Sequence, residues 1–204
     1  MVDPRTLIKT ALRPIYFRPA PDLTAGAGVS LRSLRLEDIN RLFELIEENR
    51  PHLREWLSWI ELIQDIHDCR KFIFSVNYKN IYSGKWVYGI WYGDKLVGLL
   101  DFNEPNSSKK EISIGYWLAQ KYQGRGIVSR SVKSCCSYLF KERGVKKIVI
   151  KCASDNARSR AVAIRLGFNW EGITLDAGQV NGRQVDLDQY GLTLRDWNDL
   201  HEAS

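Results

Sequence analysis

The sequence predicts one α/β domain of the α+β type, in which a mixed, mostly antiparallel sheet has helices on both faces. Two candidate hairpins, with tight turns at Gly93-Asp94 and at Asn181-Gly182, predict antiparallel strands. Between Glu111 and Ala153 a strand, a helix and a second strand follow one another, and such a crossover joins parallel neighbours. The sheet is therefore expected to hold a central parallel pair of strands among antiparallel ones.

The composition is that of an ordinary globular protein. The chain has 204 residues, of which 44% are hydrophobic and 26% are charged, and this length favours one domain. No window approaches the ~18 uninterrupted apolar residues of a membrane span. The N-terminus lacks the apolar core of a signal peptide. We therefore expect a cytoplasmic protein without a membrane partner.

The cysteines and the basic residues indicate neither a metal site nor a specific nucleic acid partner. Cys69, Cys135, Cys136 and Cys152 show no C-x-x-C or histidine-paired spacing, so no metal is expected. The formal net charge is +6 and the sequence pI is about 9.1, yet the basic residues form no long run. This net positive charge permits an anionic partner, and a polyanionic cofactor would be enough to account for some of the basic residues.

The first half of the chain predicts an arm, a strand and three helices. Residues 1–27 contain four prolines and end in a Gly-rich segment, so we expect an N-terminal arm with little regular structure. Residues 29–36 suggest the first strand, and Asp38 is a candidate cap for the helix that follows. Pro51 is expected to start a second helix, and a third runs from about residue 65 to 78.

The second half alternates strands with two helices. The expected strands are residues 86–92, 95–102, 111–119, 145–153, 168–175 and 184–194, with helices after Gly126 and from Asn156 to Leu166. The domain is thus expected to span residues 28–197, followed by a short C-terminal tail of residues 198–204.

Gly124 and Gly126 lie between the strand from Glu111 and the helix that follows it. The unpaired N–H groups of a helix N-terminus and the helix dipole both favour an anion. Glycines let a ligand approach the backbone closely because they have no side chain. The turn is therefore predicted to bind a phosphate.

Motifs around this turn resemble those of the GNAT N-acetyltransferases. Gln123-Gly-Arg-Gly-Ile127 resembles the acetyl-CoA pyrophosphate loop of that family, and residues 155–168 resemble its second cofactor element. Ile114-Gly-Tyr-Trp-Leu118, Ser159 and the later Asn-Gly-Arg-Gln-Val-Asp segment resemble the RimJ/RimL branch, which acetylates α-amines of ribosomal proteins. The resemblance covers about residues 29–197. It implies the GNAT fold, with the parallel pair splayed around an acetyl-CoA cleft.

The same resemblance implies which residues bind acetyl-CoA, the expected cosubstrate. Backbone N–H groups of residues 123–127 would hold the pyrophosphate, and those of the central strand would polarise the thioester carbonyl. Asn156 would contact the pantetheine arm, although a plain helix cap explains it equally well. The implied cofactor-binding residues are Tyr116, Trp117, Leu118, Gln123, Gly124, Arg125, Gly126, Ile127, Val128, Asn156 and Ser159.

Ser159 and Glu111 are the catalytic candidates. Many relatives use a tyrosine at the position of Ala163 as the acid, so the resemblance implies that Ser159 protonates the CoA thiolate here. The alternative is a first-turn helix serine without chemistry. RimL-like sequences often carry a glutamate at the position of Ser113, and strand alternation puts Glu111 on the same face. Glu111 is expected either to act as a base through a water or merely to border the sheet.

The expected reaction is acetyl transfer to an amine by direct attack on the thioester. An α-amine has a pKa near 8, compared with about 10.4 for lysine, so its deprotonation at neutral pH costs roughly 3 kcal/mol less. An N-terminal amine thus needs only a weak base. This suits a sequence that offers no obvious buried catalytic histidine, since His52 and His67 lie on expected helices. The resemblance implies a protein N-terminus as acceptor, of the ribosomal-protein type, and a homodimer.

Two alternatives stay open. A polyamine or aminoglycoside acceptor would require an acidic cleft, because these amines are cationic. A non-catalytic CoA-binding module would account for the tyrosine missing at Ala163 and for the shifted glutamate.

Overall fold

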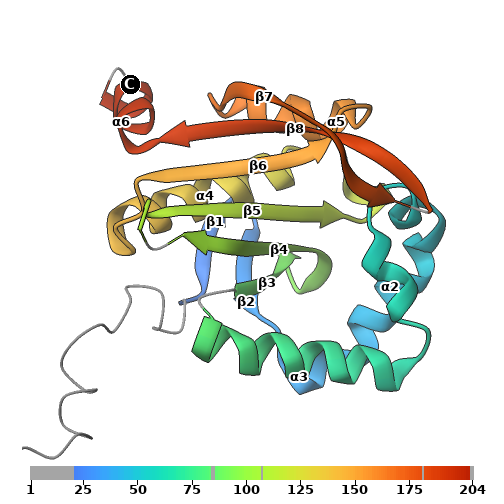
Figure 1. The fold of residues 1–204 in the computed structure, drawn as a ribbon. Helices are drawn as coiled ribbons and strands as arrows, with labels where there is room; N and C mark the ends of the chain where they lie inside the picture. The colour runs from blue at the N-terminus through green and yellow to red at the C-terminus, as the bar shows by residue number, and fades with distance from the viewer. Residues whose placement is uncertain (1–20, 84–85, 107, 181, 203–204) are drawn as a thin grey trace, which may run out of the picture.

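The computed structural model describes residues 21–83, 86–106, 108–180 and 182–202. Within these residues one sheet has the strand order β1-β2-β3-β4-β5-β6-β8-β7 (Figure 1). Its strands are β1 (Leu23–Gly26), β2 (Val29–Ser33), β3 (Trp86–Tyr92), β4 (Lys95–Asn106), β5 (Glu111–Leu118), β6 (Lys147–Ala153), β7 (Asn169–Val180) and β8 (Arg183–Thr193). The helices are α2 (Ile39–Arg54), α3 (Ile66–Ser83), α4 (Ile127–Glu142), α5 (Ala157–Arg165) and α6 (Leu194–Glu202), with 3-10 turns at Leu36–Asp38, Ser58–Leu62 and Gln120–Tyr122.

The parallel pair β5–β6 is paired only at its start. Its register runs from Glu111 opposite Lys147 to Ser113 opposite Val149. Beyond that point β5 stays paired with β4 as far as Leu118, whereas β6 stays paired with β8 as far as Ala153. The two strands therefore diverge towards their carboxyl ends and open the sheet there. The sheet is therefore mixed and mostly antiparallel with a splayed parallel pair, as predicted.

Helices cover both faces of the sheet and form a core on each side. On one face α4 packs Val132 and Leu139 against strand residues that include Ile112 and Ile148. On the other face α2 packs against β4 and α3 packs against β3, and Trp117 of β5 is buried in the same core. Each fully buried Leu, Ile or Val side chain contributes about 1.5–3 kcal/mol. Two such cores hold β5 in place between them. In the described part of the chain no helix is long and apolar enough to cross a membrane.

Helix α2 differs from the prediction, because it continues through Pro51 to Arg54. Proline lacks the N–H that would bond four residues back, which costs about 3 kcal/mol in a helix interior. The apolar stripe of α2 nevertheless runs on past the proline, and Leu53 is only 2% exposed. The burial of this last turn outweighs the lost hydrogen bond. The prediction that Pro51 starts a separate helix is therefore wrong.

Both ends of the domain also differ from the prediction. Residues 23–26 form β1, which pairs with β2, so the prediction of little regular structure is wrong for the described residues of the arm. The rest of the arm lies outside the described residues. At the other end α6 runs from Leu194 to Glu202 and so continues beyond residue 197 into the expected tail of residues 198–204. Thr193 caps this helix reciprocally, because Asp196 N donates to its Oγ1 (3.1 Å) and Thr193 N donates to Asp196 Oδ2 (3.0 Å).

Candidate active site

A cleft of about 800 Å³ opens where β5 and β6 diverge, a volume suited to a cofactor-sized ligand. Its walls come from the last turns of α2, the end of β5, the following turn with the start of α4, and α5. In Figure 1 the carboxyl end of β5 points towards α2, which closes this side of the sheet. The lining residues that the sequence had assigned to the cofactor are Tyr116, Trp117, Leu118, Gln123, Gly124, Gly126, Ile127, Val128, Asn156 and Ser159.

The turn before α4 presents free backbone donors. Gly124 and Gly126 have φ of 74° and 69°, a left-handed conformation that favours glycine. Gly126 is the N-cap of α4 and no side chain caps the helix. In the described part of the chain the N–H groups of residues 124–129 have no hydrogen-bond acceptor. A helix N-terminus with several free donors fits a pyrophosphate.

Asn156 serves as the cap of α5 and keeps its amide free. Its Oδ1 accepts a hydrogen bond from Ser159 N at 3.0 Å. Its Nδ2 finds no acceptor among the described residues and lies on the cleft wall. The two interpretations of Asn156 are therefore compatible, since the oxygen orders the helix while the nitrogen can donate to a ligand.

Ser159 forms a hydroxyl pair with Tyr116. The Tyr116 hydroxyl lies 3.1 Å from Ser159 Oγ and 3.2 Å from the Ser159 carbonyl oxygen, to which it can donate. Burial raises the pKa of Tyr116 well above its ordinary value, so the phenol stays protonated. Burial also raises the pKa of the Cys152 thiol, and the Ser159 side chain lowers this pKa in part. The cleft thus has two protonated hydroxyl groups side by side.

Two arginines on α5, which sequence reasoning missed, extend towards the phosphate turn. Arg158 Nη1 donates to Gln123 Oε1 at 2.8 Å, and Arg165 Nη1 donates to Ser129 Oγ at 3.2 Å. Both line the cleft, and neither has a carboxylate partner among the described residues. Their spacing of seven residues puts both on one face of a helix, which is the signal that could have identified them.

His52 also lines the cleft, which sequence reasoning did not anticipate. Because α2 continues through Pro51, its last turns bring His52 next to the phosphate turn, where His52 Nε2 lies 2.8 Å from Gln123 Nε2. Burial lowers the pKa of His52 from its ordinary 6.5, Glu55 raises it and Arg158 lowers it further. The ring is therefore neutral at pH 7.

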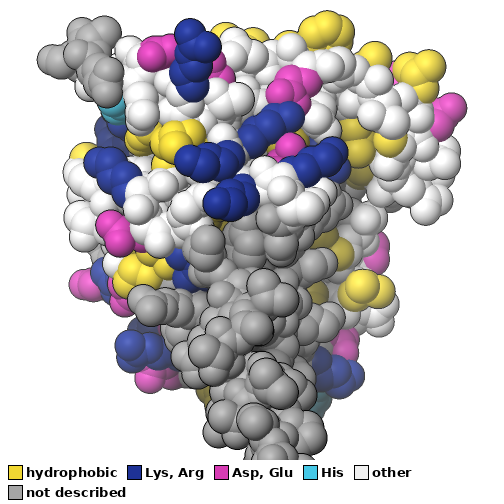
Figure 2. Space-filling view, turned by 60° about the vertical axis from the view of Figure 1, so that its left-hand side comes forward, with side chains coloured by type: hydrophobic (Ala, Val, Ile, Leu, Met, Phe, Trp, Pro, Cys, Tyr) yellow, Lys and Arg dark blue, Asp and Glu magenta, His cyan; other side chains and the backbone are white. Residues whose placement is uncertain are grey.

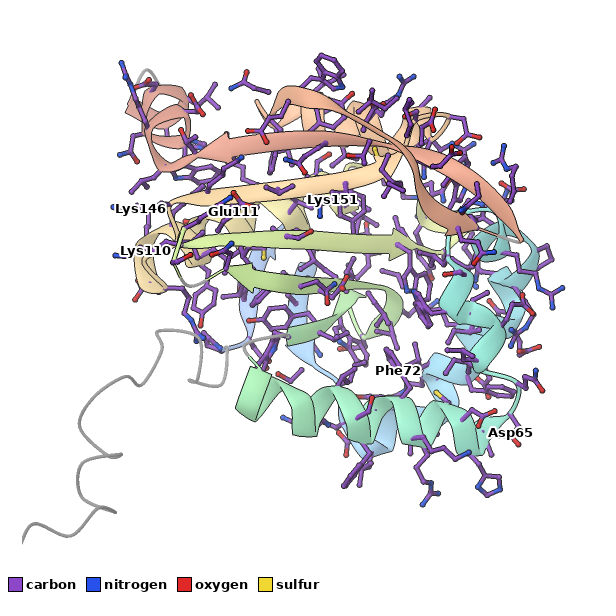
Figure 3. The ribbon with its side chains drawn as sticks, viewed as in Figure 1. Asp65, Phe72, Lys110, Glu111, Lys146 and Lys151 are labelled. Atoms are coloured by element: carbon purple, nitrogen blue, oxygen red, sulfur yellow. The ribbon has the colours of Figure 1, made fainter. Side chains whose placement is uncertain are left out.

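Two predicted residues lie elsewhere. Glu111 is at the amino end of β5 (Figure 3). Its carboxylate pairs with Lys147 at 3.5 Å. Five residues at about 3.3 Å each place it roughly 16 Å along the strand from Tyr116. That distance is too long for a base acting through one water, so Glu111 borders the sheet. The Arg125 guanidinium lies over the Tyr122 ring, 5.5 Å from its centroid, and Arg125 is not one of the residues that line the cleft.

No carboxylate belongs to the lining, which comes wholly from described residues. The charged side chains on it are Arg158 and Arg165, and the remainder are neutral. A site of this kind favours an anionic ligand and does not favour a polycation.

The family model described as "Acetyltransferase (GNAT) domain" matches residues 29–169. The chain belongs to the GNAT acetyltransferase family.

Relatives of this GNAT acetyltransferase agree with that assignment. The ribosomal-protein-serine acetyltransferase of Escherichia coli is 29% identical over 172 residues, which cover 84% of this chain and 96% of the relative. A structure of RimL, a ribosomal L7/L12 α-N-protein acetyltransferase, in complex with coenzyme A is 27% identical with a TM-score of 0.82, covering 87% of this chain and 99% of that one. The microcin C7 self-immunity acetyltransferase MccE, in complex with acetyl-CoA and AMP, is 30% identical with a TM-score of 0.79, covering 83% and 94%.

The GNAT chain is therefore an acyltransferase with acetyl-CoA as its cosubstrate. The RimJ/RimL resemblance is confirmed, since its relatives include ribosomal-protein acetyltransferases.

Proposed function

We propose that this GNAT acetyltransferase transfers the acetyl group to the N-terminal α-amine of a protein, of the ribosomal-protein type. The observation that carries the proposal is the cleft lining, which has no carboxylate among the described residues. A polyamine or an aminoglycoside carries several positive charges and would need anionic partners there. A protein N-terminus carries a single ammonium group, and the names of the relatives include acetyltransferases of ribosomal proteins.

The residues of the cleft suit acetyl-CoA as the donor. The free N–H groups of residues 124–129 would hold the pyrophosphate, with Arg158 and Arg165 as further phosphate partners. Asn156 Nδ2 would donate to the pantetheine arm. Acetyl-CoA supplies the activated acyl group, and β5 offers the backbone N–H groups on its open edge to the thioester carbonyl.

We propose that the Ser159 hydroxyl protonates the thiolate that leaves. It lines the cleft next to the Tyr116 hydroxyl, 3.1 Å away. A proton lost by Ser159 can be replaced within this pair or from the amine. Tyr116 thus supports Ser159 in the role that a tyrosine at the position of Ala163 would otherwise fill.

A group of basic side chains lies at the end of the sheet opposite the cleft (Figure 2 and Figure 3). Lys110 and Lys146 lie at the amino ends of β5 and β6, where Lys146 N donates to Lys110 O at 2.8 Å (Figure 3). Figure 2, which brings the left side of Figure 1 forward, shows Lys and Arg side chains clustered over this end. A cationic N-terminus that approaches the opposite end of β5 is therefore not repelled by this cluster.

A small-molecule amine is the second candidate. It is favoured by the likeness to MccE, whose structure contains acetyl-CoA and AMP. A small acceptor with a phosphate group would match the two arginines better than a polyamine would.

The test is an acceptor screen that measures the release of the CoA thiol. The acceptors are a library of short peptides with free N-termini, spermidine, an aminoglycoside and a nucleotide that bears an amine. Peptide-dependent release is expected. Release with small amines alone would contradict the proposal. The cytoplasm as the location and the homodimer remain predictions that accompany this function.

A further inference from the structure

His52 has no role in the chemistry described so far. It lines the cleft together with Leu53 and Trp56, all on or just after the last turns of α2. The other ionisable side chains of the described lining are Tyr116, Arg158 and Arg165. Arginine is always charged and the buried phenol is protonated, so neither can take up a proton. With Glu111 at the far end of β5, His52 is the one lining side chain that can accept a proton at neutral pH.

Gln123 determines which nitrogen of His52 carries the lone pair. Its Oε1 accepts from Arg158 Nη1, so its Nε2 faces His52 Nε2 at 2.8 Å. Because an amide nitrogen donates, His52 Nε2 must be the acceptor, and the proton of the neutral ring lies on Nδ1. Gln123 Nε2 also donates to Leu118 O at 3.3 Å, so the same amide group contacts both His52 Nε2 and the last residue of β5. The charged groups that influence the ring are Glu55, just after its own helix, and Arg158 from α5.

We propose that His52 is the base of this acetyltransferase, and that its Nε2 takes a proton from the α-ammonium group of the acceptor. The inference rests on the proposed function for the nature of the amine. An α-ammonium with a pKa near 8 is a good match for an imidazole, whereas a lysine ammonium is a much weaker acid.

One N–H bond of the ammonium breaks while the Nε2–H bond of His52 forms, and Gln123 gives up its hydrogen bond. The free lone pair of the amine attacks the thioester carbonyl, a C–N bond forms and the C–S bond breaks. Ser159 gives its proton to the thiolate and regains one from the amide nitrogen. The products are the amide, the CoA thiol and an imidazolium, which releases its proton to water.

His52→Gln is the sharpest variant, because its side-chain oxygen can still accept the hydrogen bond from Gln123 but takes up no proton. The value of kcat/KM for a peptide acceptor at pH 7 should fall about 10- to 100-fold, since roughly a tenth of the amine is already uncharged there. The KM for acetyl-CoA should not change. His67→Gln, on the exposed surface of α3, is the matched control and should behave like the wild type.

The pH profile separates a base from a residue that only positions Gln123. In the wild type kcat/KM should be independent of pH between the lowered pKa of His52 and about pH 8. At pH values below the pKa of His52 the ring is protonated, so kcat/KM should decrease there. In His52→Gln it should instead rise tenfold per pH unit up to the pKa of the amine. Imidazole in the buffer should restore part of the activity of His52→Ala.

If kcat/KM of the His52→Gln enzyme were independent of pH over the same range as in the wild type, the proposal would be overturned. Lack of rescue of a folded His52→Ala enzyme would also count against it. The acceptor question stays separate: if the wild type acetylates no peptide, the proposed function fails. The same profiles, measured with whichever amine is turned over, then still decide the role of His52.

Discussion

The Tyr116 hydroxyl lies 3.1 Å from Oγ of Ser159, and this contact joins β5 to the first turn of α5 across the splayed strands. It brings together one residue of the Ile114–Leu118 motif and one residue of the 155–168 segment. Since both groups are protonated at neutral pH, they can relay a proton between the amine and the thiolate.

Ser159→Ala should reduce kcat at least ~10-fold, because the thiolate loses its proton donor. Tyr116→Phe should cause a smaller loss. The double variant should lose less than the product of the two single effects, because the hydroxyls act as a unit. Steady-state kinetics with saturating acetyl-CoA measure this. An unchanged kcat in Ser159→Ala would mean that Ser159 is a first-turn helix residue with no catalytic role.

Gly124→Asp should raise the KM for acetyl-CoA ~10-fold or more, since it puts a carboxylate where the pyrophosphate is expected. Gly93→Asp is the matched control, because both glycines have positive φ (74° and 59°) and open space around a Cβ. Both variants should lose similar stability, but only Gly124→Asp should lose cofactor affinity. Equal KM values would refute the phosphate turn.

Arg158→Gln and Arg165→Gln should each weaken acetyl-CoA binding by about 10-fold, as expected for loss of a charge-assisted hydrogen bond. Arg183→Gln serves as the comparison, because Arg183 pairs with Asp155 at 2.9 Å and is not part of the cleft lining. Calorimetric titration with CoA gives the affinities. Identical losses in all three variants would point to general electrostatics and not to these two positions.

Trp197→Ala should destabilise the fold by about 3–5 kcal/mol. Trp197 is 6% exposed and packs on Phe140 of α4, with ring centroids 5.6 Å apart. Arg195→Ala on the same helix removes a side chain that is 91% exposed and should change the free energy of unfolding by less than about 0.5 kcal/mol. Urea unfolding measures both. A small effect at Trp197 would mean that the packing of α6 on α4 contributes little to the stability of the fold.

The sheet and the phosphate turn could be predicted because local patterns determine them. The alternation of β5 and the turn glycines each follow from a few neighbouring residues. The end of α2 could not be predicted, because tertiary burial of Leu53 decides against the local signal of Pro51. Helix α6 does carry a local signal in the sequence, the Thr193-x-x-Asp196 capping box.

The site was predictable only where a motif marks it. The residues around Gly124 and Asn156 line the cleft as the resemblance implied. Glu111 was misplaced because strand alternation gives the face of a residue but not its distance from the open end. His52 was missed because its place depends on the path of α2, and Arg158 and Arg165 because exposed arginines on a short helix are common.

The most direct test of the central claim locates the acetyl group on a matched pair of peptides. One peptide has a free N-terminus and an internal lysine, and the other is the same peptide with a formylated N-terminus. After incubation with the enzyme and acetyl-CoA, fragment mass spectrometry should find one acetyl group on the α-amine of the first peptide and none on the second. Acetyl-lysine in both peptides, or turnover of small amines alone, would contradict the account.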